Sequence, residues 1–425
     1  MAAKLLFRDE LRFAREMDQL DPLRSFRKEF YFPKYDGKNG IYLVGNSLGL
    51  QPRNTKNFVN QELEDWGALG VEGHLHARRP WAFYHRASKK SLARLVGANP
   101  SEVVAMNQLT VNLHLLMVSF YRPKKRRYKI LTEAGAFSSD QYAFETQIKF
   151  HGLDPADALI ELKPRDGEHV LRTEDIVAAI NTNADSLALV IFGGVQYYTG
   201  QFFDLKIITS AAHNAGAIAG FDLAHAIGNT PLKLHDQGVD FAVWCSYKYL
   251  NAGPGGIAGA FVHERHAADA SLPRFGGWWG HDEEERFQMK KGFKPMDGID
   301  GWQTSNVPVF QAAALLASLS LFDRAGFTRL RKKSIQLTGY LEFLLNQIDP
   351  EQDLFSIITP MNAEERGCQL SLKMKSNGKD VFKKISKKGI FADWREPAVI
   401  RVAPVPLYNT FEDVFRFSRI LKEVL

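Results

Sequence analysis

The amino-acid sequence predicts an α/β fold with a mostly parallel central sheet, helices on both faces, and a small α+β lobe at its C-terminal end. Short apolar runs alternate with helical patterns through the middle of the chain, as in parallel sheets that are buried on both faces. Beyond about residue 310 the pattern changes to two long helices followed by shorter strands. The chain has 425 residues, which is too long for one compact core.

The expected strands are short apolar runs. In chain order they are EVVAM (102–106), KIL (129–131), LALVIF (187–192), AIAGFD (217–222), DFAVWCS (240–246) and IAGAFVH (257–263). Helices are expected between them at 112–121, 140–152, 173–181 and 203–216. The last of these ends in Gly216, and glycine readily adopts the left-handed conformation that follows a helix.

We expect three parts along the chain. Residues 1–40 form an N-terminal helical segment that packs on the small lobe, because MAAKLLFRDELRFAREMD has the pattern of an amphipathic helix rather than a signal peptide. Residues 41–310 form the large α/β domain. Residues 311–425 form a small α+β domain that opens on two long helices within 309–348.

Composition narrows the class of protein. The 54 basic and 48 acidic residues give a net charge of +6, which suits an anionic small molecule but does not by itself indicate nucleic acid. The basic run RPKKRRYK (122–129) is interpreted as a solvated loop.

Cys245 and Cys368 lie far apart, which favours a reducing, cytoplasmic setting. No apolar run reaches the roughly 18 residues of a membrane span. We expect no metal, and HLH (74–76) and HERH (263–266) are interpreted as surface histidines.

Polar residues follow several expected strands where each strand stops. AIAGFD ends at Asp222, three residues before His225, and DFAVWCS ends at Ser246, two residues before Lys248. A helix begins near Thr110 after EVVAM. Ligands bind at the carboxyl ends of parallel strands. A helix N-terminus can bind phosphate, a buried carboxylate can hold a protonated ring nitrogen, and a desolvated lysine can form a Schiff base. Together these residues predict a pyridoxal 5′-phosphate site.

Each of these residues also has a purely structural interpretation. Taken alone, Asp222 is more often a helix cap, Lys248 a strand-end lysine that reaches solvent, and Thr110 an ordinary N-cap. The combination carries the prediction. The glycine-rich GPGGIAG (253–259) leads into a strand and has Ala258 where a dinucleotide fingerprint has its third glycine, so it is interpreted as making room beside a ligand.

At these residues the sequence closely resembles the kynureninase family, which are fold-type I pyridoxal-phosphate enzymes and normally homodimers. The resemblance covers nearly the whole chain. Its motifs are VGNSLGLQP (44–52), RRPW (78–81), MNQLTVNLHLLM (106–117), YTGQ (198–201), GFDLAHAIGN (220–229), CSYKYLNAGPGGIAGAF (245–261), GWWGH (277–281), ERGCQL (365–370) and IRVAPVPLYN (400–409).

The resemblance implies roles for residues at matching positions. Lys248 would hold the cofactor as a Schiff base, and Asp222 would pair with the pyridine nitrogen, with His225 nearby. Phe137 would stack on the cofactor ring, and Asp140 would support the ring or its surroundings.

Further positions complete this implied site. The backbone at Leu109 and Thr110 would hold the phosphate, helped by the Tyr247 hydroxyl, which we also expect to act as general acid or base. Trp278 and Asn306 would reach the site from the partner subunit of a homodimer, so that the active site is shared between subunits.

Substrate contacts are implied in the same way. Arg401 would bind the substrate α-carboxylate, and the pair His74 and Asn306 would lie near the substrate's aromatic ring, which favours 3-hydroxykynurenine at least as much as kynurenine. His74 could instead belong to a solvated loop. Gly193 stands where many relatives have a small hydroxyl residue, so a side-chain contact to the cofactor is missing there.

The implied activity is the hydrolysis of the Cβ–Cγ bond of L-kynurenine or 3-hydroxy-L-kynurenine to L-alanine and anthranilate or 3-hydroxyanthranilate, in tryptophan degradation and NAD biosynthesis. Another fold-type I enzyme, such as a cysteine desulfurase or an aminotransferase, is the alternative. A desulfurase needs a mobile cysteine, and Cys245 and Cys368 both fall in expected strands. A non-enzymatic binding protein that uses residues 122–129 is a second alternative.

Overall fold

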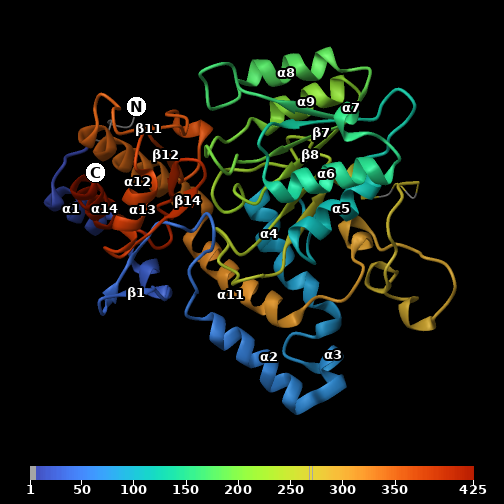
Figure 1. The fold of residues 1–425 in the computed structure, drawn as a ribbon. Coiled ribbons are helices and arrows are strands. Elements are labelled where there is room, and N and C mark those ends of the chain that lie inside the picture. Colours follow the sequence, from blue (N-terminus) through green and yellow to red (C-terminus); the bar gives the residue numbers. More distant parts are fainter. Residues whose placement is uncertain (1–5, 268, 270) are drawn as a thin grey trace.

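A seven-stranded sheet forms the centre of the larger lobe in the computed structural model, which describes residues 6–267, 269 and 271–425 (Figure 1). Its strands run in the order β4-β10-β9-β8-β7-β5-β6. In that order they span Val103–Ala105, Gly259–Val262, Phe241–Trp244, Ile218–Asp222, Leu187–Gly193, Lys129–Glu133 and Leu159–Leu162. Only β10 runs antiparallel to its neighbours, so the mostly parallel sheet that the sequence predicts is confirmed.

Alternating side chains place the sheet between two layers of helices. On β9, Phe241 and Val243 join the cluster under α5 and α6, while Ala242 and Trp244 join the cluster under α4, α8, α9 and α11. The helices of this lobe are α2 (Thr55–Leu69), α3 (Gly73–His76), α4 (Lys89–Val96), α5 (Leu109–Phe120), α6 (Ser138–Phe150), α7 (Pro155–Ala158), α8 (Thr173–Thr182), α9 (Leu205–Asn214), α10 (Glu264–Ala267) and α11 (Val309–Ala325). Strands buried on both faces explain the continuous apolar runs in the sequence.

The strand β9 carries the chain to Lys248 and is fixed by close packing. All four of its residues are buried, and Gly259 of β10 lies opposite Trp244 in the antiparallel register. A Cβ atom at Gly259 would overlap the Trp244 indole ring, so glycine is required there by the close approach of the two strands. The edge strand β6, which we did not predict, is partly exposed and contains Glu161.

The smaller lobe is built on a four-stranded antiparallel sheet in the order β11-β12-β15-β14. Those strands span Phe355–Ile357, Leu370–Met374, Val399–Val402 and Asp393–Arg395. The helices packed with it are α1 (Leu11–Leu20), α12 (Phe327–Ile348), α13 (Gly378–Ser386) and α14 (Phe411–Val424). Two-residue strands complete the fold: β1 (Lys34–Tyr35) pairs with β2 (Lys38–Asn39), and β3 (Ile41–Tyr42) pairs with β13 (Ile390–Phe391).

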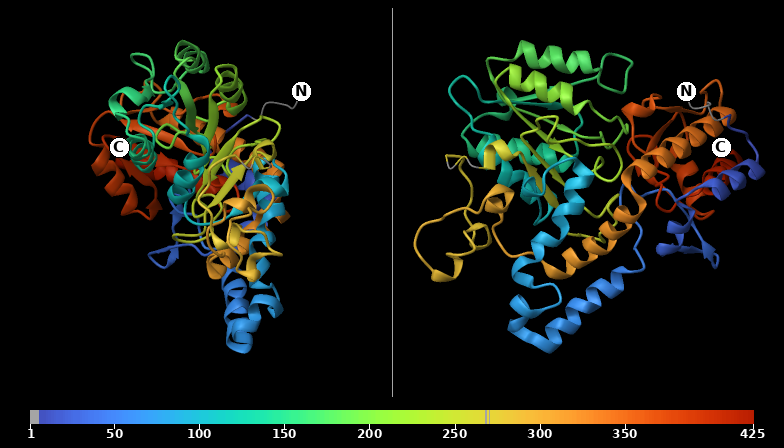
Figure 2. Two further views of the ribbon diagram at one scale, coloured as in Figure 1. Left: turned by 90° about the vertical axis from the view of Figure 1, so that its right-hand side faces the viewer. Right: turned by 180° about the vertical axis from the view of Figure 1, so that it is seen from behind.

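The N-terminal helix α1 lies against α14 of the smaller lobe (Figure 2). Asp18 of α1 accepts hydrogen bonds from the backbone N–H groups of Phe411 (2.7 Å) and Glu412 (3.0 Å), which are free in the first turn of α14. The boundaries at residues 40 and 310 stay a prediction. Because the apolar residues of α11 pack in the core of the larger lobe and most of those of α12 in the core of the smaller lobe, we propose that the division falls at Gly326, between the two helices.

Within the residues that the structure describes, no helix combines the length and the apolar character needed to cross a lipid bilayer.

Candidate active site

A cavity of about 70 Å³ lies at the carboxyl ends of β8 and β9. Topology explains its position, because the parallel strands β5, β7, β8 and β9 all end at this edge of the sheet. Eight residues that the sequence singled out line it together: Leu109, Thr110, Phe137, Asp140, Asp222, His225, Tyr247 and Lys248.

The turn that carries Lys248 is held by backbone hydrogen bonds. Ala252 donates to the Ser246 carbonyl (3.0 Å), and Gly49 donates to the Tyr247 carbonyl (2.8 Å). Lys248 Nζ lies 3.0 Å from His225 Nε2 and 5.7 Å from the centre of the Phe137 ring. The turn therefore directs the amine into the cavity while its backbone is anchored to the segment that contains Gly49.

Two buried carboxyl groups, Asp140 and Asp222, face this amine. Burial raises the pKa of both, and the charge of Asp222 raises the pKa of Asp140 further. The nearby Lys248 charge and a hydrogen bond from the Ala224 N–H (2.7 Å) oppose the rise at Asp222. A single lysine does not compensate two buried carboxylates, so the cavity favours a ligand that brings a further positive charge or a proton.

Glu133 is a third acidic group in the cavity, and the sequence analysis missed it. Burial raises its pKa to about 7, and its carboxylate accepts the Gly193 N–H at 3.1 and 3.2 Å. A Cβ atom at Gly193 would lie 3.0 Å from Glu133 Oε1. The missing side chain at Gly193 thus lets Glu133 reach the backbone of β7. Glu133 ends its strand just as Asp222 does, and that signal could have identified it.

His225 is buried beside Lys248 and is held in its neutral form. Burial, followed by the positive charge of Lys248, lowers the pKa of His225 well below its usual value. Among the described residues, its Nδ1 atom has no hydrogen-bond partner. A neutral imidazole can accept a hydrogen bond from the Lys248 amine through Nε2.

The N-terminus of α5 opens onto the same cavity at Leu109 and Thr110. Its N-cap residue, Gln108, is extended and makes no side-chain capping bond. The N–H groups of the first turn are therefore left for another acceptor, and together with the helix dipole they suit a phosphate group.

Arg401 lies behind the cavity wall rather than on it. It is almost fully buried on β15, where Nη1 donates to the Tyr197 carbonyl (2.7 Å) and Nη2 pairs with Asp393. Burial lowers the pKa of Arg401 to about 10. Tyr197 lines the cavity and packs edge-on against Phe137, with 5.2 Å between ring centres. Neither Tyr197 nor Asp393 was predicted from the sequence as a site residue.

The structure does not bring His74, Trp278 or Asn306 into this cavity. All three are exposed: His74 lies on α3, Trp278 begins a short 3₁₀ helix, and Asn306 precedes α11. His74 packs edge-on against Trp81 with 5.5 Å between ring centres. Within one chain, these residues are therefore separate from Lys248.

Solved structures and the site together define the class of enzyme. The cysteine desulfurase of Thermococcus onnurineus NA1, solved in its apo form, superposes with a TM-score of 0.75 at 19% identity, covering 90% of this chain and 94% of that chain. This likeness concerns the fold. The molecule therefore has the architecture of the fold-type I class of pyridoxal-phosphate enzymes, with a lysine, a strand-end carboxylate and an open helix N-terminus around one cavity.

The chain belongs to the kynureninase family. It is 54% identical over 420 residues to the kynureninase of Flavobacterium psychrophilum, with 99% of each chain covered, and 57% identical over 423 residues to that of Myxococcus xanthus, again with 99% covered. The family model described as the kynureninase C-terminal domain matches residues 330–421.

The buried carboxyl groups lead to a prediction about stability in the cofactor-free protein. The pKa of Asp140 is higher in the folded chain than in the unfolded chain, so its contribution to stability is lost as pH rises above about 4 and through the folded pKa. Asp140→Asn removes this loss. We expect the variant to have a higher free energy of unfolding than the parent at pH 8, because its neutral amide carries no charge for burial to penalise.

Urea unfolding of the two cofactor-free proteins at pH 5 and pH 8 measures this difference, which should be larger at pH 8. The control is Asp166→Asn, since Asp166 is exposed and its replacement should leave stability unchanged at both pH values. An Asp140→Asn protein that is less stable than the parent at pH 8 would contradict the prediction, because it would show that neighbouring groups stabilise the Asp140 charge.

Proposed function

We propose that this protein is a hydrolase acting on carbon–carbon bonds in ketonic substances, which cleaves the Cβ–Cγ bond of L-kynurenine or 3-hydroxy-L-kynurenine with pyridoxal 5′-phosphate as its cofactor. The products are L-alanine and anthranilate or 3-hydroxyanthranilate. The observation that carries the proposal is the cavity in which Lys248 faces two buried carboxyl groups and the open N-terminus of α5, in a chain of the kynureninase family. The proposed reaction belongs to tryptophan degradation and NAD biosynthesis in the cytoplasm.

The residues present fit this cofactor. The N–H groups at Leu109 and Thr110 would hold its phosphate, and the Tyr247 hydroxyl would assist them. The Asp222 carboxylate would accept a hydrogen bond from the protonated ring nitrogen, whose positive charge the buried carboxylates need. Phe137 would stack on the ring, and Lys248 would hold the aldehyde carbon. When bound, the cofactor supplies an electron sink for the substrate Cα.

The chain's own residues then move protons and orient the substrate. The Lys248 amine would take the proton from the substrate Cα, and the neutral His225 imidazole beside it would accept a hydrogen bond from that amine. Arg401 binds the substrate α-carboxylate through its planar guanidinium. Water would add to the γ-carbonyl carbon, and the bond from that carbon to Cβ would break. Cβ would keep the electron pair and take up a proton to become the methyl group of alanine, while the γ-carbon would leave as the aromatic carboxylic acid.

Tyr247 is the proposed general acid or base at the γ-carbonyl. Burial raises the pKa of its hydroxyl, which keeps the group protonated at neutral pH and able to donate to the carbonyl oxygen. Tyr247 lines the same cavity as Lys248, and Lys248 Nζ lies 5.9 Å from the centre of the Tyr247 ring.

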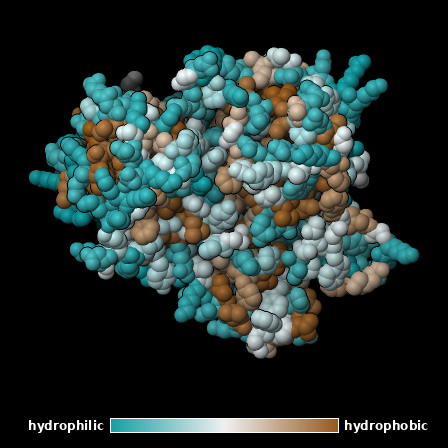
Figure 3. Space-filling model, viewed as in Figure 1, coloured by the Kyte–Doolittle hydropathy of each residue, from teal (hydrophilic) through white to brown (hydrophobic). Residues whose placement is uncertain are grey.

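The active site is proposed to be shared between the subunits of a homodimer. Exposed apolar side chains lie on the segments that carry these residues: Leu63 and Trp66 on α2, Val71 and Leu75 next to His74 in sequence, and Phe275, Phe287, Met289 and Phe293 in the segment that contains Trp278. Figure 3 shows apolar surface at the lower end of the molecule, where α2 and α3 lie. Apolar patches of this kind mark protein interfaces. His74 and Asn306 would then contact the aromatic ring of a substrate bound by the partner.

A cysteine desulfurase function is disfavoured by the two cysteines. Cys245 and Cys368 are both buried, and burial raises the pKa of the Cys368 thiol to about 12. A nucleophilic cysteine needs access to the substrate and a thiolate at neutral pH.

Lys248→Ala tests the proposed function. Wild-type protein should release alanine together with an aromatic amino acid product, and borohydride should fix one cofactor per chain, detected by mass. The variant should lose turnover by at least about a thousandfold, because the base at Cα is gone. Lys163→Ala, which changes an exposed lysine, should behave like the parent. Comparing rates with kynurenine and 3-hydroxykynurenine identifies the preferred ring. Wild-type-like turnover by Lys248→Ala would overturn the proposal.

Tyr247→Phe separates proton transfer from cofactor binding. We expect kcat to fall by about a hundredfold or more, since general acid–base catalysis contributes 10²–10⁴-fold, while borohydride still fixes the cofactor to Lys248. Near-normal turnover in this variant would remove the role from Tyr247.

Mixing two variants tests the shared site. Lys248→Ala and Trp278→Ala chains are co-refolded and assayed at limiting cofactor. A mixed dimer contains one site with both Lys248 and Trp278, so activity should exceed the sum of the two separate proteins. Activity equal to that sum would place each site within one chain.

A further inference from the structure

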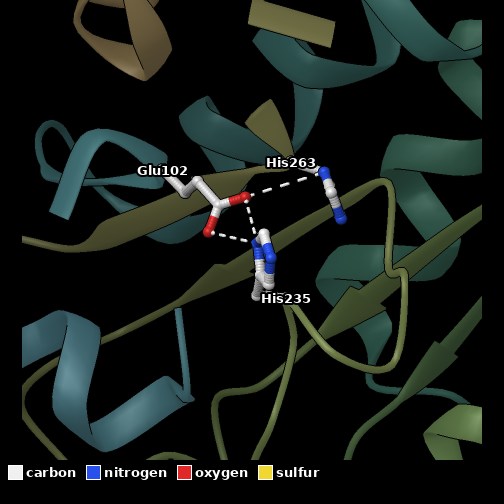
Figure 4. A group of neighbouring side chains, drawn as sticks. All are labelled: Glu102, His235 and His263. Atoms are coloured by element: carbon white, nitrogen blue, oxygen red, sulfur yellow. Dashed lines mark hydrogen bonds and ion pairs between the residues drawn. The ribbon is translucent and has the colours of Figure 1, made fainter. Parts of the chain in front are cut away.

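Three potential metal ligands converge at the edge of the large sheet opposite Lys248 (Figure 4). Glu102 ends the 3₁₀ helix Pro100–Glu102 just before β4, and His263 follows β10 directly. The strands are antiparallel neighbours in which Val103 lies opposite Phe261, so the two side chains meet at one end of the pair. His235 reaches them from the loop that precedes β9.

The three side chains lie close enough together to share one ion. His235 Nδ1 lies 2.9 and 3.1 Å from the two carboxylate oxygens of Glu102, and His263 Nδ1 lies 3.6 Å from Glu102 Oε1. One potential ligand atom from each residue lies within 4.8 Å of the other two. Ligand atoms about 2.0 Å from one ion in tetrahedral geometry are separated by distances close to these.

The carboxylate is held by the backbone around it. Glu102 is fully buried and accepts hydrogen bonds from the N–H groups of Asn99 (2.8 Å) and Glu264 (2.9 Å). The backbone N–H of His235 donates to the Gly97 carbonyl (3.1 Å), which anchors the loop that precedes β9. Such outer contacts orient the ligands before an ion binds.

Both imidazoles are engaged within the protein: His235 Nδ1 pairs with Glu102, and His263 Nδ1 accepts the Arg265 backbone N–H at 3.2 Å. His263 has a side chain that is only 12% exposed, so it is not the surface histidine that we expected, and burial lowers its pKa and keeps it neutral. Its ring stacks on that of His235, with 4.9 Å between centres and 20° between planes. Since stacked rings do not point at one ion, one ring must turn, and His235 has the more exposed side chain, at 32%.

We propose that Glu102, His235 and His263 bind a divalent transition metal ion of the zinc type. Two imidazole nitrogens and one carboxylate oxygen suit Zn²⁺, Co²⁺ or Ni²⁺, whereas Mg²⁺ and Ca²⁺ prefer oxygen ligands alone. The ion replaces the proton between His235 and Glu102 and joins β4, β10 and the loop before β9. Three protein ligands leave a fourth position for water.

Zinc titration of the cofactor-loaded enzyme tests the site. After treatment with a chelator and dialysis, calorimetry with ZnCl₂ should show one saturable site per chain and a rise in the midpoint of thermal unfolding. His263→Gln and His235→Gln should each weaken binding at least about tenfold. His76→Gln, which removes an exposed imidazole on α3, should bind zinc like the parent.

Cobalt provides a readout that is independent of activity. Co²⁺ should give visible absorption bands of a four-coordinate ion in the parent, and these bands should be absent from the His235→Gln/His263→Gln protein in difference spectra. Turnover by the metal-free double variant should match that of the metal-free parent, which shows that it is folded. Equal zinc binding by the parent and the double variant would overturn the proposal and leave Glu102 and His235 as a hydrogen-bonded pair that closes the sheet edge.

Discussion

The burial of carboxyl groups next to a single amine is the constraint around which the larger lobe is arranged. Asp140, Asp222 and Glu133 all have raised pKa values because they lie away from water, and Lys248 is the cation nearest to them in the cavity. Such a cluster costs stability on its own. In the proposed function, a protonated ring nitrogen would bring the positive charge that this cluster lacks, so the residues that cost stability would also contribute affinity for the cofactor.

The rigidity of the sheet makes this arrangement possible. β9 is buried on both faces and packs through Trp244 against Gly259, which fixes the backbone from which Lys248 emerges. The opposite edge is tied by Glu102 and its neighbours across β4 and β10. One sheet thus positions two sets of chemical groups. The Lys248 cavity lies where the parallel strands end, and the group of Glu102, His235 and His263 lies where those strands begin.

Much of this was predictable from the sequence, and the exceptions have physical causes. Continuous apolar runs mark buried strands, so Asp222 and Lys248 were found where those runs stop. Glu133 was missed because its strand continues through Thr132, a polar residue that is nevertheless buried. Asp393 became visible only through the register that pairs it with Arg401 across β14 and β15. Neither register nor strand order can be inferred from composition, and the grouping of Glu102 with the histidines depends on both.

The contact between Arg401 and Asp393 bears on the proposed binding of a substrate carboxylate. An amino acid would not meet a solvated guanidinium but one that already holds an internal carboxylate and the Tyr197 carbonyl. If Arg401 binds the substrate as proposed, binding would exchange one anion for another, and the gain in free energy would be the difference between two similar ion pairs. Asp393 and Arg401 also lie opposite each other in the backbone register of β14 and β15, so this exchange would take place inside the sheet of the smaller lobe.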